Sequence, residues 1–189
     1  MCIRDSSALV LRDMLSSETP DIRFKASAVL ALHGIDEGVP QLIKFVKEGV
    51  DEKPEGKNTV PSWEAAIPFL GMARDKKAVP VLVGVLKDKK SGLDTLIAAV
   101  RALGQIGEKS VIPELKELLR REDLPTKRIF QVSSGGVKPV VEDARWQIEL
   151  AVAETLSKLG EIDKEIRKIV EPHLNDKRAY VRRYAKKIV

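Results

Sequence analysis

Glycine and proline recur along this 189-residue sequence at intervals that few folds produce. Gly34 precedes Pro40 by six residues, and Gly107 precedes Pro113 by the same six residues. Pro40, Pro80 and Pro113 are separated by steps of 40 and then 33 residues. A repeat length in this range is typical of solenoids built from stacked pairs of helices.

The segment Thr95–Pro113 is the clearest copy of the repeating unit. It contains a helix rich in alanine and leucine, two nearby glycines, a short polar turn and a proline that opens the next helix. Glycine reaches the left-handed conformation that ends many helices, and proline suits the first helical turn because its missing N–H would have no partner there. We therefore predict an all-α fold, a right-handed α-solenoid of about five helical hairpins.

The repeats are predicted to form a single domain over residues 7–189. Their expected bounds are 7–34, 35–74, 75–107, 108–160 and 161–189, and their second helices are expected at 21–33, 62–73, 94–106, 143–159 and 178–189. The last repeat is expected to be truncated, because its second helix lacks the glycine that closes the others. We expect Met1–Ser6 to be a non-native leader and the chain to be a fragment of a longer array.

Two insertions interrupt the repeats, at residues 49–61 and 122–142. In the second, Ile129–Val132 and Val137–Val141 flank the sequence Ser-Ser-Gly-Gly, which is typical of a β-hairpin with a four-residue loop. Pro139 restricts the second arm to the edge of a sheet. We therefore predict a small β-hairpin inside the fourth repeat.

The composition fits a helical protein with a charged, solvated surface. Aromatic residues make up only 4% of the chain, which favours helices packed through small aliphatic side chains. The net charge of +5 permits an acidic partner without requiring one. No apolar run reaches the roughly 18–20 residues that span a bilayer. A single cysteine, Cys2, excludes an internal disulfide framework, and we expect a cytoplasmic protein.

Four groups of residues carry a resemblance to a known family. They are Asp21-Ile22-Arg23 with Ala26, Ala78-Val79-Pro80 with Leu82, Leu86 and Asp88, the run Ala102–Gly107, and Asp176 with Val181-Arg182 and Ala185. In these positions the sequence resembles HEAT repeats, specifically the short bacterial kind known as bilin-lyase-type HEAT repeats. The resemblance implies that the first helix of each pair lines the convex side and the second helix the concave side.

The resemblance also implies a ladder of hydrogen bonds between neighbouring repeats. In the family, an Asp in the turn and an Arg early in the second helix form it. At the position of this Arg, the five repeats have, in order, Arg23, Trp63, Leu96, Glu149 and Arg182. The three central repeats therefore depart from the pattern.

Residues typical of catalysis or metal binding are sparse. The sequence has two histidines and one cysteine, and it has neither a Ser-His-Asp spacing nor a cluster of metal-ligand type. When the repeats are aligned, His33 lies at the position of Ile106 and Leu159, which favours a role in the core or as a helix cap. His173 is expected at the surface beside the end of a helix. We therefore predict no enzyme activity, no catalytic residue, no metal and no cofactor.

Cationic residues become more frequent toward the C-terminal half. Glu161–Val189 contains nine Lys or Arg residues against five Asp or Glu residues. The repeat alignment also places eight further residues on the concave face, namely Phe24, Lys25, Ala28, Glu64, Pro68, Ile97, Leu150 and Tyr184. The partner-binding residues that we predict on this face are Arg101, Glu154, Lys158, Arg183 and Lys187. A charged face that serves only solubility is the alternative interpretation.

The two insertions supply the second set of predicted binding residues. Each precedes a second helix that carries one of the two tryptophans, Trp63 and Trp146. Tryptophan is enriched at binding hot spots, although each could instead cover the end of the core beneath a long loop. We predict that the hairpin, with Phe130 at its centre and Lys127, Arg128 and Lys138 around it, forms one wall of a partner site with Trp146. Trp63 is predicted as a further partner-binding residue.

These features favour a non-catalytic scaffold or adaptor. A rigid, preorganised groove lowers the ordering cost of binding an extended protein segment, and an acidic segment is one option. A first alternative is nucleic-acid binding through the basic concave face. A second alternative, implied only by the family resemblance, is an accessory subunit of a bilin-lyase-like activity.

Overall fold

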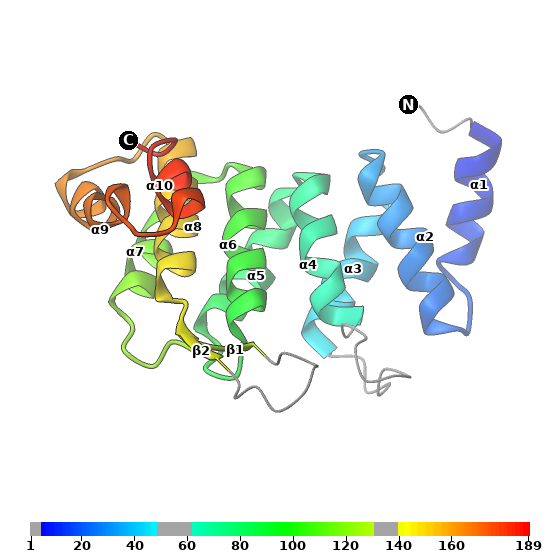
Figure 1. Cartoon of the computed structure of the whole chain (residues 1–189). Helices are drawn as coiled ribbons and strands as arrows, with labels where there is room; N and C mark the ends of the chain where they lie inside the picture. Colours follow the sequence, from blue (N-terminus) through cyan, green and yellow to red (C-terminus); the bar gives the residue numbers. More distant parts are fainter. Residues whose placement is uncertain (1–4, 49–61, 131–139) are drawn as a thin grey trace.

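The computed structural model describes residues 5–48, 62–130 and 140–189 (Figure 1). The helices in these ranges are α1 (Asp5–Met14), α2 (Pro20–Leu32), α3 (Gly38–Glu48), α4 (Ser62–Ala73), α5 (Val79–Lys87), α6 (Leu93–Ile106), α7 (Ile112–Arg120), α8 (Arg145–Lys158), α9 (Lys164–Leu174) and α10 (Ala179–Ala185). Short 3-10 turns, Lys76–Ala78 and Lys109–Val111, lead into α5 and α7, and two strands, β1 (Lys127–Phe130) and β2 (Val140–Asp143), precede α8.

The helices form the two layers of an α-solenoid, which confirms the predicted fold class (Figure 1). The even-numbered helices make up the inner layer, and the odd-numbered helices make up the outer layer. Helices α2, α4, α6 and α8 pack directly against one another, whereas successive outer helices touch much less. Because the inner layer is the more tightly packed, the solenoid curves toward it, and its surface is the concave face.

Glycines inside the inner helices allow this close packing. A Cβ atom added at Gly71 in α4 would lie 2.6 Å from the Cα of Ala102 in α6. One added at Gly104 in α6 would lie 3.0 Å from the side chain of Thr155 in α8. The 33-residue spacing of the two glycines therefore marks a repeated contact between neighbouring inner helices.

The inner helices end in left-handed residues, but not always in glycine. Gly34, Gly107 and Gly160 have φ values of 70°, 77° and 81°. At the end of α4, Arg74 holds this conformation with a φ of 55°. We expected a glycine to close every inner helix except the last, and this was wrong for α4. The glycine near its end, Gly71, instead allows α4 to contact α6.

The helix bounds follow the predicted ones closely, with two differences in the C-terminal half. Helix α4 spans the predicted residues, but α8 begins at Arg145 because Asp143 belongs to β2. The carboxylate of Asp143 accepts the backbone N–H of Arg145, 2.9 Å away, as a cap does. Helix α10 ends at Ala185 rather than at the predicted Val189.

Strands β1 and β2 form an antiparallel pair, as the hairpin prediction requires. The pairing runs from Lys127 opposite Asp143 to Phe130 opposite Val140, so both strands begin or end outside the predicted arms at Lys127 and Asp143. The other predicted arm residues, 131–132 and 137–139, lie outside the described residues. Two ion pairs join the strands to the solenoid, Arg128 with Asp94 of α6 and Glu142 with Arg178, which precedes α10. The hairpin thus connects the third, fourth and fifth repeats.

The arginines of the expected ladder make their hydrogen bonds within one repeat. Arg23 donates to the carbonyl oxygens of Ser17 and Glu18, at 2.7 and 2.8 Å. Arg182 donates in the same way to the carbonyl oxygens of Asp176 and Lys177. The expectation of bonds between neighbours was therefore wrong for these two arginines, which stabilise the turn before their own helix.

Candidate protein-binding groove

An apolar groove of about 650 Å³ lies between α4 and α6 on the concave face. It is called the α4–α6 groove below. Its lining residues are Glu64, Ala65, Pro68, Phe69 and Met72 from α4, and Gly92, Leu93, Asp94, Thr95 and Ala98 from the start of α6.

Regular helical spacing produces the two walls of the groove. Ala65, Pro68 and Met72 follow one another at three and four residues, so they share one face of α4. Asp94 and Ala98 share a face of α6 in the same way. Alanine and proline are short, so the groove remains open between the helices.

The floor of the groove is fixed by aromatic packing. Phe69 is half-buried, and its ring lies 5.9 Å from the ring of Phe24 in an edge-to-face arrangement. Phe24 makes the same kind of contact with Phe45 at 5.6 Å. Such aromatic pairs contribute about 0.5–1.5 kcal/mol in addition to the stabilisation from the area they bury. The floor of the groove is therefore held in place before any partner binds.

Pro68 interrupts the helical hydrogen bonds of this wall. Proline lacks an N–H, so it donates no hydrogen bond to the carbonyl oxygen of Glu64, four positions earlier. Pro68 itself is exposed and lines the groove.

Carboxylates mark the N-terminal end of the groove. The hydroxyl group of Thr95 donates a hydrogen bond to Glu64, which joins the two walls. Asp94 forms an ion pair with Arg128 of β1, and its side chain remains 82% exposed. The hairpin is thereby attached to the rim of the α4–α6 groove.

A cluster of charged groups lies beyond the C-terminal end of the groove. Arg101 follows Ala98 by three residues on the same face of α6, about 10 Å along the helix from Asp94. On α8, Glu154 pairs with Lys158 at 2.7 Å and accepts a hydrogen bond from the hydroxyl of Tyr184 on α10 at 2.5 Å. Three inner helices therefore contribute to one polar cluster.

The pKa values in this cluster reflect burial and the neighbouring charges. Burial and the carboxylate of Glu154 together raise the pKa of the Tyr184 phenol to about 12, although Arg101 opposes them. Burial also opposes ionisation of Glu154, but the groups of Lys158, Tyr184 and Arg101 outweigh it and hold the pKa of that carboxyl below its ordinary value. Glu154 is therefore a carboxylate at neutral pH, and Tyr184 is a neutral donor.

The structure brings together some of the predicted concave residues. Arg101, Glu154 and Lys158 belong to the same cluster. Arg183 and Lys187 are exposed and lie within three residues of Tyr184 in the sequence. The placement of Ala28, Ile97 and Leu150 on the concave surface was wrong, because all three residues are buried in the core.

Trp146 contacts two side chains from the last repeat. The guanidinium group of Arg178 lies 4.7 Å from the centre of its ring, and the ring of Tyr180 lies 5.7 Å away. Its indole N–H is buried and has no hydrogen-bond partner among the described residues. Arg178 also pairs with Asp176 at 2.8 Å and with Glu142, so the ring takes part in the joint between the hairpin and the last repeat.

Of the other predicted edge residues, Trp63 lies in a different part of the solenoid. Trp63 is half-buried and lines a smaller hollow of about 340 Å³ between α3 and α5, with Val46 and Pro80. Of Phe130 only its strand position is described, and Lys138 lies outside the described residues. A partner site formed by the hairpin and Trp146 stays a prediction.

Of the ten residues that line the groove, the sequence interpretation placed Glu64 and Pro68 on the concave face and missed the other eight. Ala65, Met72 and Ala98 are three of these. Their signal was available as two facing stripes of small or flexible side chains at helical spacing. Met72 is the most informative, because a methionine that is 48% exposed offers an adaptable apolar contact.

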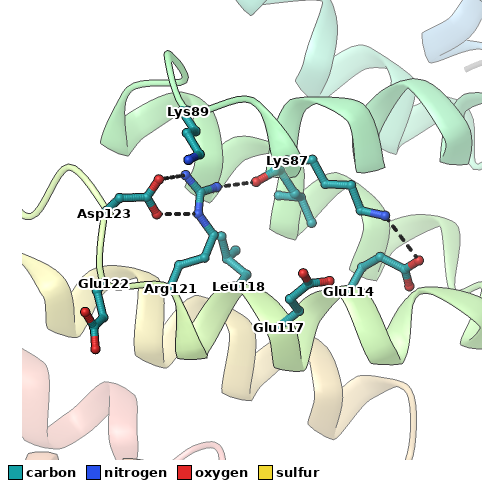
Figure 2. Close-up of a pocket in the computed structure, with 9 residues that line it drawn as sticks. Lys87, Lys89, Glu114, Glu117, Leu118, Arg121, Glu122 and Asp123 are labelled. Atoms are coloured by element: carbon teal, nitrogen blue, oxygen red, sulfur yellow. Dashed lines mark hydrogen bonds and ion pairs between the residues drawn. The ribbon is translucent and has the colours of Figure 1, made fainter.

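A further hollow, of about 560 Å³, lies on the outer layer between α5 and α7. Figure 2 shows its charged lining. Arg121 donates to Asp123 at 2.8 Å and to the carbonyl oxygen of Leu86 at 2.5 Å, so it caps the end of α5. Lys87 pairs with Glu114 at 3.8 Å. These charges compensate one another and join two outer helices, which favours a structural role.

The histidines and acidic residues make no metal site in the described ranges. No group of three or more His, Cys, Asp or Glu residues there could hold an ion. His33 caps α2, as one of its predicted roles requires. His173 was expected at the surface, but its side chain is only 13% exposed, because it contacts the carboxylate of Glu149 at 3.0 Å. None of the described helices is long and apolar enough to cross a membrane.

The repeated inner and outer helices, with a groove on the concave face, define a helical-repeat protein. Residues 64–130 match the family model for HEAT repeats, which confirms the predicted resemblance over that segment. A comparison with curated protein sequences gives no match.

Solved structures support the same fold over almost the whole chain. The complex of CpcE and CpcF of phycocyanin lyase from Nostoc sp. PCC7120 is similar with a TM-score of 0.63 and 20% sequence identity. The similarity covers 96% of this chain, which spans 63% of the length of the solved chain. At this identity the likeness concerns the fold.

Proposed function

We propose that the protein is a scaffold that binds another protein through the α4–α6 groove and the adjoining concave face. One observation carries the proposal: the groove is apolar, about 650 Å³ in volume and lined by exposed Met72 and Pro68. Ligand sites are typically apolar hollows of this size with a few polar groups at their edges. Glu64 and Asp94 provide such groups.

The groove is suited to an extended segment rather than to a small metabolite. It runs along two parallel helices, is open to solvent, and continues toward the polar cluster of Arg101 and Tyr184. Its walls are fixed by the core, so a bound segment has to order only itself.

The test is a co-precipitation experiment with a matched pair of variants. Met72→Glu places a charge in the groove at an exposed position, and Met14→Glu makes the same change on α1, where the methionine is 41% exposed. We expect wild type and Met14→Glu to retain the same partner, identified by mass spectrometry from a bacterial lysate, and Met72→Glu to lose it. Equal retention by both variants would contradict the proposal.

A second candidate function is that of an accessory subunit in a bilin-lyase-like activity. The observation that favours it is the fold similarity to the complex of CpcE and CpcF of phycocyanin lyase. The chain would then act together with a second subunit. Mixing it with phycocyanin and candidate subunits, and following bilin absorbance, tests this function, and an unchanged spectrum counts against it.

A further inference from the structure

Large apolar side chains are exposed mainly on the first repeat, at the N-terminal end of the solenoid (Figure 1). Of the ten that are exposed among the described residues, six belong to its two helices. Single exposed apolar residues are ordinary on a protein surface, but a group of them marks an interaction site. The six, called the first-repeat surface below, are Leu9, Val10 and Met14 of α1 and Ile22, Val29 and Leu32 of α2.

The position of Val29 faces a neighbouring inner helix in later repeats. Val29 lies five residues before the left-handed glycine that ends α2, and Ala102 in α6 and Thr155 in α8 lie five residues before theirs. Ala102 is buried against Gly71 of α4, and Thr155 is buried against Gly104 of α6. The side of an inner helix that holds this position therefore packs on the inner helix before it.

Ile22 belongs to the same side of α2. It precedes Val29 by seven residues, and Thr95 and Ile148 hold the same position in α6 and α8. Thr95 and Ile148 are buried, whereas Ile22 is exposed. Among the described residues no inner helix precedes α2, so a side that is covered in later repeats is open here. This side of α2 thus has the composition of a packing surface.

The residue spacing on this side of α2 is that of a helix seam. Ile22, Lys25, Val29 and Leu32 follow one another at three, four and three residues, as alternating a and d positions of a coiled coil do. β-branched residues at a with leucine at d favour pairs of helices in parallel coiled coils. The ammonium group of Lys25, the polar member of the seam, already pairs with Asp21 at 2.6 Å. The seam therefore fits another helix with apolar residues at the same spacing.

Helix α1 adds apolar residues that its contact with α2 does not use. Ala8 is buried and Leu15 is half-buried, so these residues belong to the side of α1 that packs on α2. Val10 and Met14 are one helical turn apart, share another face of the helix and are exposed. They are therefore available to a partner.

The opposite end of the solenoid is unsuited to cover the first-repeat surface. There Arg183 of α10 and the following Lys186 and Lys187 are exposed. Stacking this end on the first-repeat surface of another copy would bury cations against apolar side chains, which is costly. Two first-repeat surfaces bring apolar side chains together instead.

We propose that two copies of the chain associate through their first-repeat surfaces, with α2 of each copy at the centre and α1 beside it. Such an interface is isologous, because each copy contributes the same residues, and it closes at a dimer. Two helical hairpins then pack as a four-helix bundle with apolar side chains between them. The surface shares no residue with the α4–α6 groove, so each copy keeps its groove, and the inference does not depend on what the groove binds.

The experiment is sedimentation velocity of the full chain from about 1 µM to about 100 µM, a range that brackets a micromolar dissociation constant. Val29→Glu places a charge in the seam, and Val141→Glu makes the same change at an exposed residue of β2 as a control. Val10→Glu changes the surface independently, on α1. Circular dichroism first checks that each variant keeps the helix content of wild type and a melting temperature within a few degrees of it.

We expect the mass of wild type and of Val141→Glu to rise with concentration and to level off at twice the chain mass. Val29→Glu should raise the dissociation constant at least about 100-fold, because each dimer would bury two unpaired carboxylates, and Val10→Glu should also weaken the dimer. High salt should leave the wild-type dimer intact, since its contacts are apolar rather than ionic.

Three results would overturn the inference. A wild-type chain that stays monomeric over the whole range would leave the first-repeat surface to a different partner, such as a further helical repeat. Species larger than a dimer would indicate head-to-tail stacking. A dimer that Val29→Glu and Val10→Glu leave unchanged would place the contact elsewhere. If Val29→Glu did not fold, Val10→Glu alone would decide the last point.

Discussion

At the scale of single residues, Arg74 has a backbone conformation that its side chain disfavours. Its φ of 55° is in the left-handed region, where a Cβ atom costs about 1–2 kcal/mol. The side chain is exposed and makes no hydrogen bond or ion pair with the described residues. Arg74→Gly should therefore increase the free energy of unfolding by about 1 kcal/mol, measured by urea denaturation, and raise the melting temperature by about 2–4 °C.

Gly107 provides the reverse change as a control. It has a φ of 77° in the equivalent cap of α6, and an added Cβ would have nothing within 4 Å. Gly107→Ala should thus be destabilising by about 1 kcal/mol through backbone conformation alone. A loss of stability in Arg74→Gly would show that the arginine stabilises the turn by contacts that outweigh its backbone cost.

The same residues show what could be read from the sequence and what could not. Gly34, Gly107 and Gly160 were predictable caps, because a glycine after an apolar helix has one common explanation. Gly71 and Gly104 precede the cap position by three residues and have another explanation, which is contact between helices. Sequence spacing alone does not separate these explanations, because the second depends on the neighbouring repeat.

At the scale of elements, the contact of α4 with α6 depends on Gly71. A Cβ at this position would lie 2.6 Å from the Cα of Ala102 and 2.3 Å from the side-chain oxygen of Gln105. Backbone atoms of α6 cannot yield as a flexible side chain does, so Gly71→Ala should destabilise the protein by about 1–3 kcal/mol. The measurement is the midpoint of urea denaturation followed by circular dichroism.

Gly84 in α5 is the matched control for this change. An added Cβ there meets no atom within 4 Å. Gly84→Ala should increase stability by up to about 1 kcal/mol, because alanine is the better helix former. If both substitutions stabilised the protein, the inner helices would not be held at the spacing seen here.

Helices were more predictable than the groove for a physical reason. The 3.6-residue apolar period is a local property, and it gave the bounds of α4 without error. The α4–α6 groove depends on how deeply the side chains of two repeats interdigitate, which is a property of their packing. Projection onto the concave face identified Glu64, Pro68 and Arg101, but it also included Leu150, whose side chain the neighbouring repeat covers.

At the scale of the whole molecule, the main packing contacts among the described helices join elements of the same repeat or of neighbouring repeats. Each inner helix from α4 to α8 has neighbours on both sides, whereas α1 and α10 lie at the ends of the layers (Figure 1). The stability of such an array is close to a sum of repeat and nearest-neighbour contributions. Local damage should therefore remain local.

Hydrogen exchange followed by mass spectrometry measures this locality directly. Val181 is fully buried in α10, so Val181→Ala should cost about 2 kcal/mol in the last repeat. We expect faster exchange in α9 and α10 and a smaller change in α8, with α2 to α4 unaffected, because none of these helices contacts α10. Uniformly faster exchange along the chain would mean that the repeats unfold as one cooperative unit. In that case changes at the last repeat would also alter the population of the intact α4–α6 groove, and binding would depend on stability far from the site.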